Sequence, residues 1–208
     1  MRPLRESLSI KSLTMMGVPK HFCKKTLMDF DTYKDKGLKS VKTFVSDYLD
    51  NLVDNIEENR GIFFYGSNGV GKSMLSCIIL KEAYRYRYSC RRVTFSNYVH
   101  YYTNSWDKKG NEREVYDSDF YESYKGVEFL VLEELGKEID SKIAKPILED
   151  LLRYREEHGL VTIMCSNIDP HTIEELYGAS VMSLIKGSMT PICITSKDKR
   201  LEVYKNAK

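Results

Sequence analysis

The sequence predicts an α/β fold in which helices cover both faces of a mainly parallel, five-stranded sheet, giving three layers. Short apolar runs alternate along the chain with longer segments of helical periodicity, and parallel strands need such helical crossovers between them. Pro191 places the last run at an edge of the sheet or makes its strand begin late, because proline has no N–H group for a ladder bond. The runs with strand character are residues 61–65, 91–96, 127–132, 160–166 and 189–195.

Segments with helical spacing flank and connect these strands. Residues 38–59 carry apolar side chains at i, i+3 and i+4 throughout, which predicts one long amphipathic helix packed on the core. Residues 73–86 predict the next helix. Pro146 is expected in the first turn of a helix that runs to about residue 158. The dipeptide Asp169-Pro170 opens a further helical region, to about residue 186.

Length and composition predict one domain. A chain of 208 residues with 42% hydrophobic side chains can bury a full core. Residues 1–16 are basic and lack a periodic pattern, so we expect a short N-terminal tail followed by a single domain over residues 17–208. The 32 basic and 30 acidic residues leave a net charge of +2, so a nucleic-acid contact would need a local patch.

Cysteine usage and hydropathy predict a cytoplasmic protein. The five cysteines form no C-x-x-C pair, which is typical of reduced core thiols. No apolar stretch follows Arg2 and Arg5 as in a signal peptide, and no apolar run approaches the roughly 18 residues that span a bilayer. The four histidines lack metal-ligand spacing. We therefore expect neither a membrane partner nor a zinc site.

The segment after the first strand matches the pattern G-x-x-x-x-G-K-[ST]. Between a strand and a helix this pattern predicts a phosphate-binding P-loop. Its backbone N–H groups and the helix N-terminus would surround the phosphates of ATP, Lys72 would reach the β- and γ-phosphates, and the Ser73 hydroxyl would ligate Mg²⁺. The predicted ATP-binding residues are Gly66, Ser67, Asn68, Gly69, Val70, Gly71, Lys72, Ser73 and Met74.

Two acidic residues end the third apolar run. Phe129-Leu130-Val131-Leu132 is followed by Glu133, Glu134, Leu135 and Gly136, the form of a Walker B strand. One carboxylate at such a strand tip can hold the hydration shell of Mg²⁺, and the next can polarise an attacking water. The alternative is a buried strand whose solvated end carries glutamates.

Asn167 follows the fourth apolar run. It would emerge at the carboxyl edge of the sheet beside the P-loop, where open α/β sheets bind their ligands. There its amide could orient water or the γ-phosphate. The alternative is a turn residue.

Together the three motifs resemble the AAA+ ATPases of the DnaC/DnaI helicase-loader family, to which the IstB transposition helper is also similar. The resemblance runs from about Gly17 to Arg200 and includes Gly17-Val18-Pro19, LVLEELG, TIMCSN, Arg153-Tyr154 and residues 197–200. It implies the P-loop AAA+ form of the three-layer fold. By this resemblance, Glu133 would bind Mg²⁺, Glu134 would be the catalytic carboxylate and Asn167 would be the sensor residue. Lys72 would also take part in catalysis.

The chain departs from the family in two ways that concern hydrolysis. Both Walker B acids are glutamates, whose extra methylene moves the Mg²⁺-side carboxylate by on the order of 1.5 Å. The family also has arginines, one of which acts in trans on a neighbour's ATP, where this chain has Ser180 and Leu184. An arginine finger contributes about 10³ to 10⁵ in rate, so we expect slow hydrolysis. Arg153, Arg155 and Arg200 remain as substitutes.

Aromatic and basic residues are interleaved between the second and third strands. Such side chains stack bases and follow the phosphates of single-stranded DNA. The alternative is a core stripe, because Val99, Tyr102 and Trp106 have helical spacing. A second basic patch, residues 85–92, is expected to be a solvated helix end. The candidate DNA contacts are Tyr101, Tyr102, Trp106, Lys108 and Lys109.

The sequence thus predicts an ATP- and Mg²⁺-dependent replication protein that acts on a replicative helicase, on single-stranded DNA, or on both, and that can assemble with itself in a ring or spiral. One alternative is an IstB-like transposition helper that binds duplex DNA and a transposase. Another is a weakly hydrolysing, ATP-gated interaction module such as a helicase antagonist. A small-molecule kinase is disfavoured because the paired acids indicate attack by water. A compact loader of this kind would suit a phage or mobile element.

Overall fold

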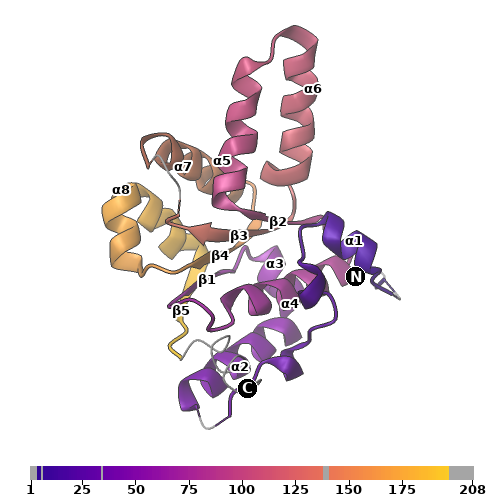
Figure 1. Ribbon diagram of the computed structural model, residues 1–208, viewed down its shortest axis with the longest axis vertical. Coiled ribbons are helices and arrows are strands. Elements are labelled where there is room, and N and C mark those ends of the chain that lie inside the picture. Colours follow the sequence, from indigo (N-terminus) through magenta and orange to yellow (C-terminus); the bar gives the residue numbers. More distant parts are fainter. Residues whose placement is uncertain (1–3, 6, 34, 138–140, 197–208) are drawn as a thin grey trace, which may run out of the picture.

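A five-stranded parallel sheet forms the middle of the protein (Figure 1). The computed structural model describes residues 4–5, 7–33, 35–137 and 141–196. All four strand pairings are parallel, which confirms the predicted α/β class, and Pro191 lies in the edge strand β5. In spatial order the strands are β2 (Cys90–Thr94), β3 (Phe129–Leu135), β4 (Val161–Ser166), β1 (Gly61–Tyr65) and β5 (Met189–Cys193).

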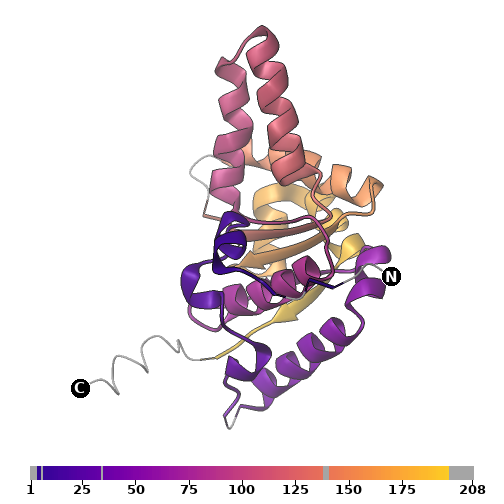
Figure 2. The same ribbon diagram turned by 90° about the vertical axis from the view of Figure 1, so that its right-hand side faces the viewer.

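Helices cover both faces of this sheet and complete the three predicted layers (Figure 2). One core cluster joins the sheet to helices α2 (Lys36–Asp50), α3 (Leu52–Glu57) and α4 (Lys72–Arg85). The other joins it to α7 (Ser141–Glu157) and α8 (Pro170–Ser188). Neighbouring strand residues point into opposite clusters, as Phe63 and Phe64 do, because side chains alternate across a sheet.

Two predicted helices differ from the observed ones. In place of one helix over residues 38–59, there are two helices over residues 36–57, α2 and α3, which are separated at Asn51. The Asn51 side chain donates to the Asp47 carbonyl at 2.9 Å, and such bonds compete with the helical ladder. Pro146 lies inside α7 and not in its first turn, because α7 already begins at Ser141. Ala144, which precedes the proline, is fully buried in the core, so packing favours the earlier start.

The N-terminal segment contains a short helix that packs on the core. Helix α1 (Ile10–Met15) is capped by the Ser9 side chain. Leu13 and Met16 belong to the first core cluster, and the Arg92 backbone N–H donates to the Met16 carbonyl at 2.8 Å. The division into a tail at 1–16 and a domain at 17–208 stays a prediction. Two 3₁₀ turns follow, η1 (Lys20–Phe22) and η2 (Leu27–Asp29).

A helical hairpin projects from the sheet between β2 and β3 (Figures 1 and 2). Its interior is aromatic, and the rings of Tyr98 and Phe120 lie 5.1 Å apart, as do those of Tyr101 and Tyr124. In the part of the chain that the structure describes, none of the helices has the length and apolar character needed to cross a membrane. The hairpin consists of α5 (Phe95–Thr103), η3 (Asn104–Asp107), α6 (Gly110–Phe120) and the π-helical turn η4 (Tyr121–Lys125).

The five cysteines are free thiols, and all but Cys193 are buried. Burial raises the pKa of Cys77 to about 12. The same cause raises the pKa values of Cys90 and Cys165 well above the ordinary range. These thiols therefore stay protonated at neutral pH and belong to the core.

Candidate nucleotide site

The P-loop connects β1 to α4 and lines a cavity of about 460 Å³. Gly69 and Gly71 have φ angles of 77° and 104°, a conformation that side-chain-bearing residues rarely adopt. Gly71 is also tightly covered, since an added Cβ would lie 2.7 Å from the Phe30 ring. The loop thus turns sharply into the N-terminus of α4. The positive end of that helix favours an anion in the cavity.

Lys72 lies within this cavity with its ammonium group folded against the loop. Its side chain is almost buried, and Nζ donates to the backbone oxygens of Gly66 and Ser67, each at 2.7 Å. The lysine is therefore held beside the path that a phosphate chain would take along the loop.

Glu133 reaches the P-loop helix from β3. Ser73 Oγ donates to Glu133 Oε2 at 2.6 Å, and Ser76 Oγ donates to Oε1 at 2.7 Å. Only 2% of the Glu133 side chain is exposed, and Arg92 Nε lies 3.4 Å from Oε1. The structure thus brings together Ser73 and Glu133, the two predicted Mg²⁺ ligands. A hydroxyl and a carboxylate oxygen beside a phosphate loop are the hard oxygen donors that Mg²⁺ accepts, so these residues fit the ion.

A β-bulge separates the roles of the two glutamates. Leu132 pairs with Met164 and Leu135 pairs with Ser166, so that both glutamates face a single residue of β4. Glu134 has a φ of 61°. Its carboxylate is exposed and lies 3.1 Å from Lys137 Nζ. The bulge therefore buries one carboxylate against α4 and leaves the next at the cavity surface.

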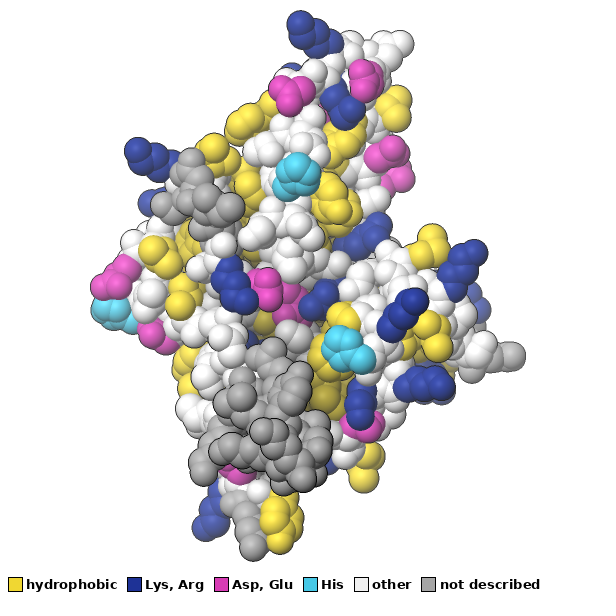
Figure 3. All heavy atoms as spheres, in the orientation of Figure 1, with side chains coloured by type: hydrophobic (Ala, Val, Ile, Leu, Met, Phe, Trp, Pro, Cys, Tyr) yellow, Lys and Arg dark blue, Asp and Glu magenta, His cyan; other side chains and the backbone are white. Residues whose placement is uncertain are grey.

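Asn167 joins the same cavity from the end of β4. The turn is held by Ser166, whose hydroxyl donates to the Leu135 carbonyl at 2.9 Å and accepts from the Ile168 N–H at 3.1 Å. The predicted catalytic residues Lys72, Glu134 and Asn167 thus line one cavity. Their catalytic roles stay predictions. Acidic and basic side chains meet on this face below the hairpin (Figure 3).

One wall of the cavity comes from a segment in which the sequence indicated no site. Residues 19–31, between α1 and α2, contribute side chains that cover the loop from the outside. The Gly17-Val18-Pro19 string was the only sequence signal here, and it does not specify which side chains face the cavity. The wall is formed by Pro19, His21, Phe22, Asp29, Phe30 and Asp31.

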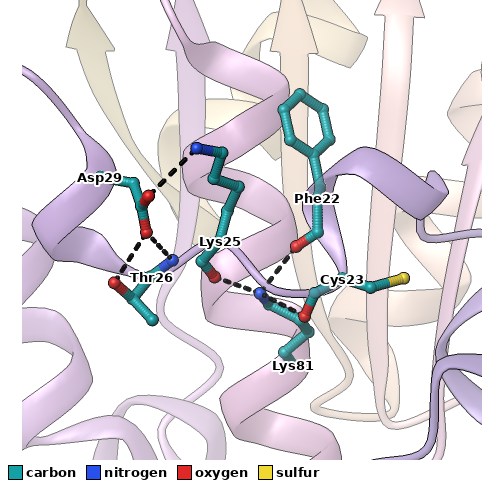
Figure 4. Close-up of polar contacts among 6 residues, drawn as sticks. All are labelled: Phe22, Cys23, Lys25, Thr26, Asp29 and Lys81. Carbon is teal, nitrogen blue, oxygen red and sulfur yellow. Dashed lines mark hydrogen bonds and ion pairs between the residues drawn. The ribbon is translucent and has the colours of Figure 1, made fainter.

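Lys81 ties this wall to α4 (Figure 4). Its ammonium group donates to the backbone oxygens of Phe22 at 2.8 Å and Cys23 at 3.2 Å, and also to that of Lys25. Asp29 closes the next turn by accepting bonds from the Thr26 N–H at 2.8 Å and from its hydroxyl at 3.0 Å. The Thr26 N–H, the Lys25 ammonium at 3.0 Å and the Thr26 hydroxyl together lower the pKa of Asp29 to about 2. A buried lysine thus holds three carbonyls of a segment that is otherwise short of regular structure.

The proteins to which this chain is similar include helicase loaders. No family model matches the chain. The replicative helicase loader DnaI of Bacillus subtilis is 24% identical over 169 residues, covering 75% of this chain and 52% of the relative. A crystal structure of DnaI is 26% identical with a TM-score of 0.67, covering 86% of this chain and 96% of that one. In sequence and fold the chain is DnaC/DnaI-like.

A second structure agrees in fold. The crystal structure of the DnaC helicase loader has a TM-score of 0.72 at 21% identity, covering 85% of this chain and all of that one. This agreement confirms the P-loop AAA+ form of the three-layer fold. The chain spans about half the length of the curated relative.

The arginine substitutes considered for this DnaC/DnaI-like protein differ sharply in exposure. Arg155 is 1% exposed, and its guanidinium donates to Thr162 Oγ1 and to three backbone oxygens. It cannot reach another subunit. Arg153 is half-exposed and pairs with Glu149 at 2.9 Å. Arg200 lies outside the described residues.

The two positions that lack the family arginines also differ. Leu184 is buried in the second core cluster, so an arginine there would disrupt the core. Ser180 is exposed, and its hydroxyl donates to Glu149 at 2.6 Å. Of these two positions, Ser180 is therefore the one from which a side chain could reach a neighbouring subunit.

The candidate DNA contacts lie on the hairpin, away from the nucleotide cavity. Tyr101 stacks on Tyr124, and Tyr102 packs edge-on against Phe120, so these two rings belong to the hairpin interior. Trp106 is 55% exposed. Lys108 bonds to Glu112 at 2.8 Å, one turn further along. Lys109 is exposed.

The second basic patch is not a solvated helix end throughout. Arg91 and Arg92 lie on β2. Arg91 donates to the Ser123 carbonyl at 2.9 Å and packs over the Tyr124 ring. Arg92 lines the nucleotide cavity. The sequence did not indicate this role, because Arg92 approaches Glu133 only once β2 and β3 have paired.

Proposed function

We propose that this chain binds ATP with Mg²⁺ in the cavity beside the P-loop and acts in DNA replication as a helicase-loader-like ATPase. The observation that carries the proposal is the 2.6 Å contact between Ser73 and Glu133, which joins the phosphate loop to the acidic strand tip across 60 residues. A glycine-rich turn without a function would not require this contact.

Each side chain of the cavity has a task in this proposal. Lys72 and the N-terminus of α4 hold the phosphates, and the wall of residues 19–31 covers the remainder of the nucleotide. Ser73 and Glu133 would hold Mg²⁺, which supplies positive charge to the phosphates. Glu134, at the cavity surface, takes a proton from water, and the Asn167 amide orients that water.

The partner in this proposal is a replicative helicase. It rests on the curated relative, which is a replicative helicase loader, and on the matching fold of the two loader structures. Single-stranded DNA is a second proposed ligand, held through the exposed Trp106 and Lys109 at the hairpin tip.

A second candidate is an ATP-gated interaction module with little turnover. Two observations favour it, since Leu184 is buried in the core and Arg155 is enclosed. Among the described residues that were considered as trans-acting arginines, only Arg153 is exposed.

Substitution of Lys72 tests the nucleotide site. Lys72→Ala removes a charge-assisted bond to phosphate, so we expect ATP affinity to fall by about 10- to 100-fold in calorimetric titrations. Lys39→Ala, at an exposed position of α2, is the matched control. Unchanged affinity in Lys72→Ala would contradict the nucleotide site.

Substitution of Glu134 and a partner assay separate the two candidates. We expect Glu134→Gln to keep ATP binding and to lose hydrolysis by about 10²-fold or more. Normal turnover would move the catalytic role to Glu133. A pull-down against a replicative helicase and a transposase, with ATP and with ADP, tests the partner. Capture of the helicase supports the loader, and a slow turnover that DNA and helicase leave unchanged supports the interaction module.

A further inference from the structure

Arg92 brings a fixed positive charge to the acidic strand tip. It lies near the end of β2, and its Nε is 3.4 Å from Glu133 Oε1. Its side chain is 15% exposed, and it lines the nucleotide cavity. Its NH1 donates to the Gly17 carbonyl at 3.2 Å, which fixes the guanidinium from the N-terminal side. Nε itself is buried without a hydrogen-bond partner in the described structure, so its contact with Glu133 is an ion pair.

Glu133 is thereby satisfied from three directions within the chain. The hydroxyls of Ser73 and Ser76 each bond to one of its oxygens at 2.6 and 2.7 Å, and Arg92 balances its charge. A buried carboxylate without such partners would be costly to ionise. Both oxygens of Glu133 therefore have partners within the chain before any ion enters the cavity.

The pairing changes the field that a phosphate chain would meet. An uncompensated carboxylate beside the P-loop repels a triphosphate unless a divalent cation lies between them, because charges interact strongly where water is largely excluded. With Arg92 beside Glu133, that repulsion is reduced from within the chain. The neighbouring Arg91 has no such effect, since its guanidinium bonds to Met15 and Ser123 and packs on Tyr124.

We propose that Arg92 is a built-in counter-cation for Glu133, so that the cavity binds a nucleoside triphosphate with little dependence on divalent metal. The inference rests on the proposed ATP site and makes Arg92 a positioning residue of that site. The weak dependence on divalent metal is a property that the P-loop and the strand-tip acids do not themselves predict.

The test is a titration of ATP in excess Mg²⁺ and in EDTA. We expect the dissociation constants of the unsubstituted chain to differ by less than about 10-fold between the two conditions. Arg92→Gln should raise the constant in EDTA by on the order of 10-fold and change it much less in Mg²⁺. The double variant Arg92→Gln with Glu133→Gln should recover the affinity in EDTA, because the repelling charge is gone. Arg91→Gln is the matched control.

The outcomes separate this inference from the function on which it rests. Binding in Mg²⁺ that weakens more than about 10-fold in EDTA would overturn the role of Arg92 and leave the ATP site standing. An equal loss in both conditions in Arg92→Gln would also overturn it, by showing a purely structural role. Absence of ATP binding in either condition would overturn both. Thermal unfolding without ATP would reveal whether Arg92→Gln folds poorly. Even in that case, the unsubstituted chain decides whether ATP binding depends on divalent metal.

Discussion

Charged side chains serve different purposes at the nucleotide cavity and at the hairpin tip. Lys81, 8% exposed, bonds to carbonyls 56 to 59 residues away in the sequence. Lys108 bonds to Glu112, four residues away and 72% exposed. A buried charge that joins distant segments is costly to remove, whereas an exposed pair within one helical turn contributes little.

At the base of the hairpin, as beside the nucleotide cavity, a buried charged side chain joins segments that are far apart in the sequence. Arg155 of α7 bonds to the carbonyls of Lys125 and Val127, where η4 ends and the chain enters β3. It also bonds to Thr162 and to the Val161 carbonyl of β4. The hairpin is therefore anchored at its base by a buried cation, although Lys108 at its tip pairs locally.

The largest expected effect follows from removing this anchor. Arg155→Met leaves three carbonyls and one hydroxyl without their donor, so we expect the free energy of unfolding to fall by about 3–5 kcal/mol in urea denaturation. Arg153→Met, two residues earlier on the same helix and half-exposed, is the control and should change stability little. A similar loss in the free energy of unfolding in both variants would show that Arg155 stabilises the fold no more than the surface residue Arg153 does.

A smaller effect is expected at the cavity wall. Lys81→Met frees the carbonyls of Phe22, Cys23 and Lys25, and we expect a loss of about 1–3 kcal/mol in the free energy of unfolding. ATP affinity should also fall, because the wall loses its tie to α4. Lys39→Met is the exposed control. If stability falls while ATP affinity stays the same, the wall does not contribute to nucleotide binding.

Alkaline pH tests the buried side of α4. Burial raises the pKa of Cys77 from 9.0 to about 12, so the folded chain keeps a proton that the unfolded chain releases above pH 9. This contribution to stability is present below pH 9 and is lost as pH rises toward 12, by about 1.4 kcal/mol per pH unit. Between pH 9 and 10 the thiol of the unfolded chain is only partly ionised, so Cys77→Ala should flatten the fall in stability there by about 1 kcal/mol. Cys193→Ala, at an exposed thiol, is the control, and equal flattening in both variants would contradict the assignment.

The smallest effect on stability is expected at the hairpin tip. The double variant Lys108→Gln with Lys109→Gln should melt at the same temperature as the unsubstituted chain, since these lysines hold no distant segment. If they contact single-stranded DNA, the slope of log affinity against log salt should decrease by about 1.4 for the two lost phosphate contacts. An unchanged slope in fluorescence-anisotropy titrations would exclude the tip lysines as DNA contacts.

The strands and the phosphate loop were predictable because their signals are local. Residues 66–73 form one continuous motif, and β1, β4 and most of β3 are continuous apolar runs between turn or helical segments. The helix boundaries were less predictable. The break at Asn51 lies where the backbone leaves the helical conformation and the side chain bonds to the Asp47 carbonyl, and the early start of α7 accompanies the burial of Ala144. Apolar spacing alone shows neither.

The sequence by itself thus determined the α/β class, the P-loop and the approach of Glu133, Glu134 and Asn167 to one edge of the sheet. The pairing of β2 with β3 was needed to bring Arg92 to Glu133. The bulge at Glu134 and the wall of residues 19–31 tied by Lys81 likewise follow from packing. The physical reason is that these contacts join segments far apart in the chain. Their partners are chosen by the shape and burial of the folded core, on which short-range sequence patterns carry no information.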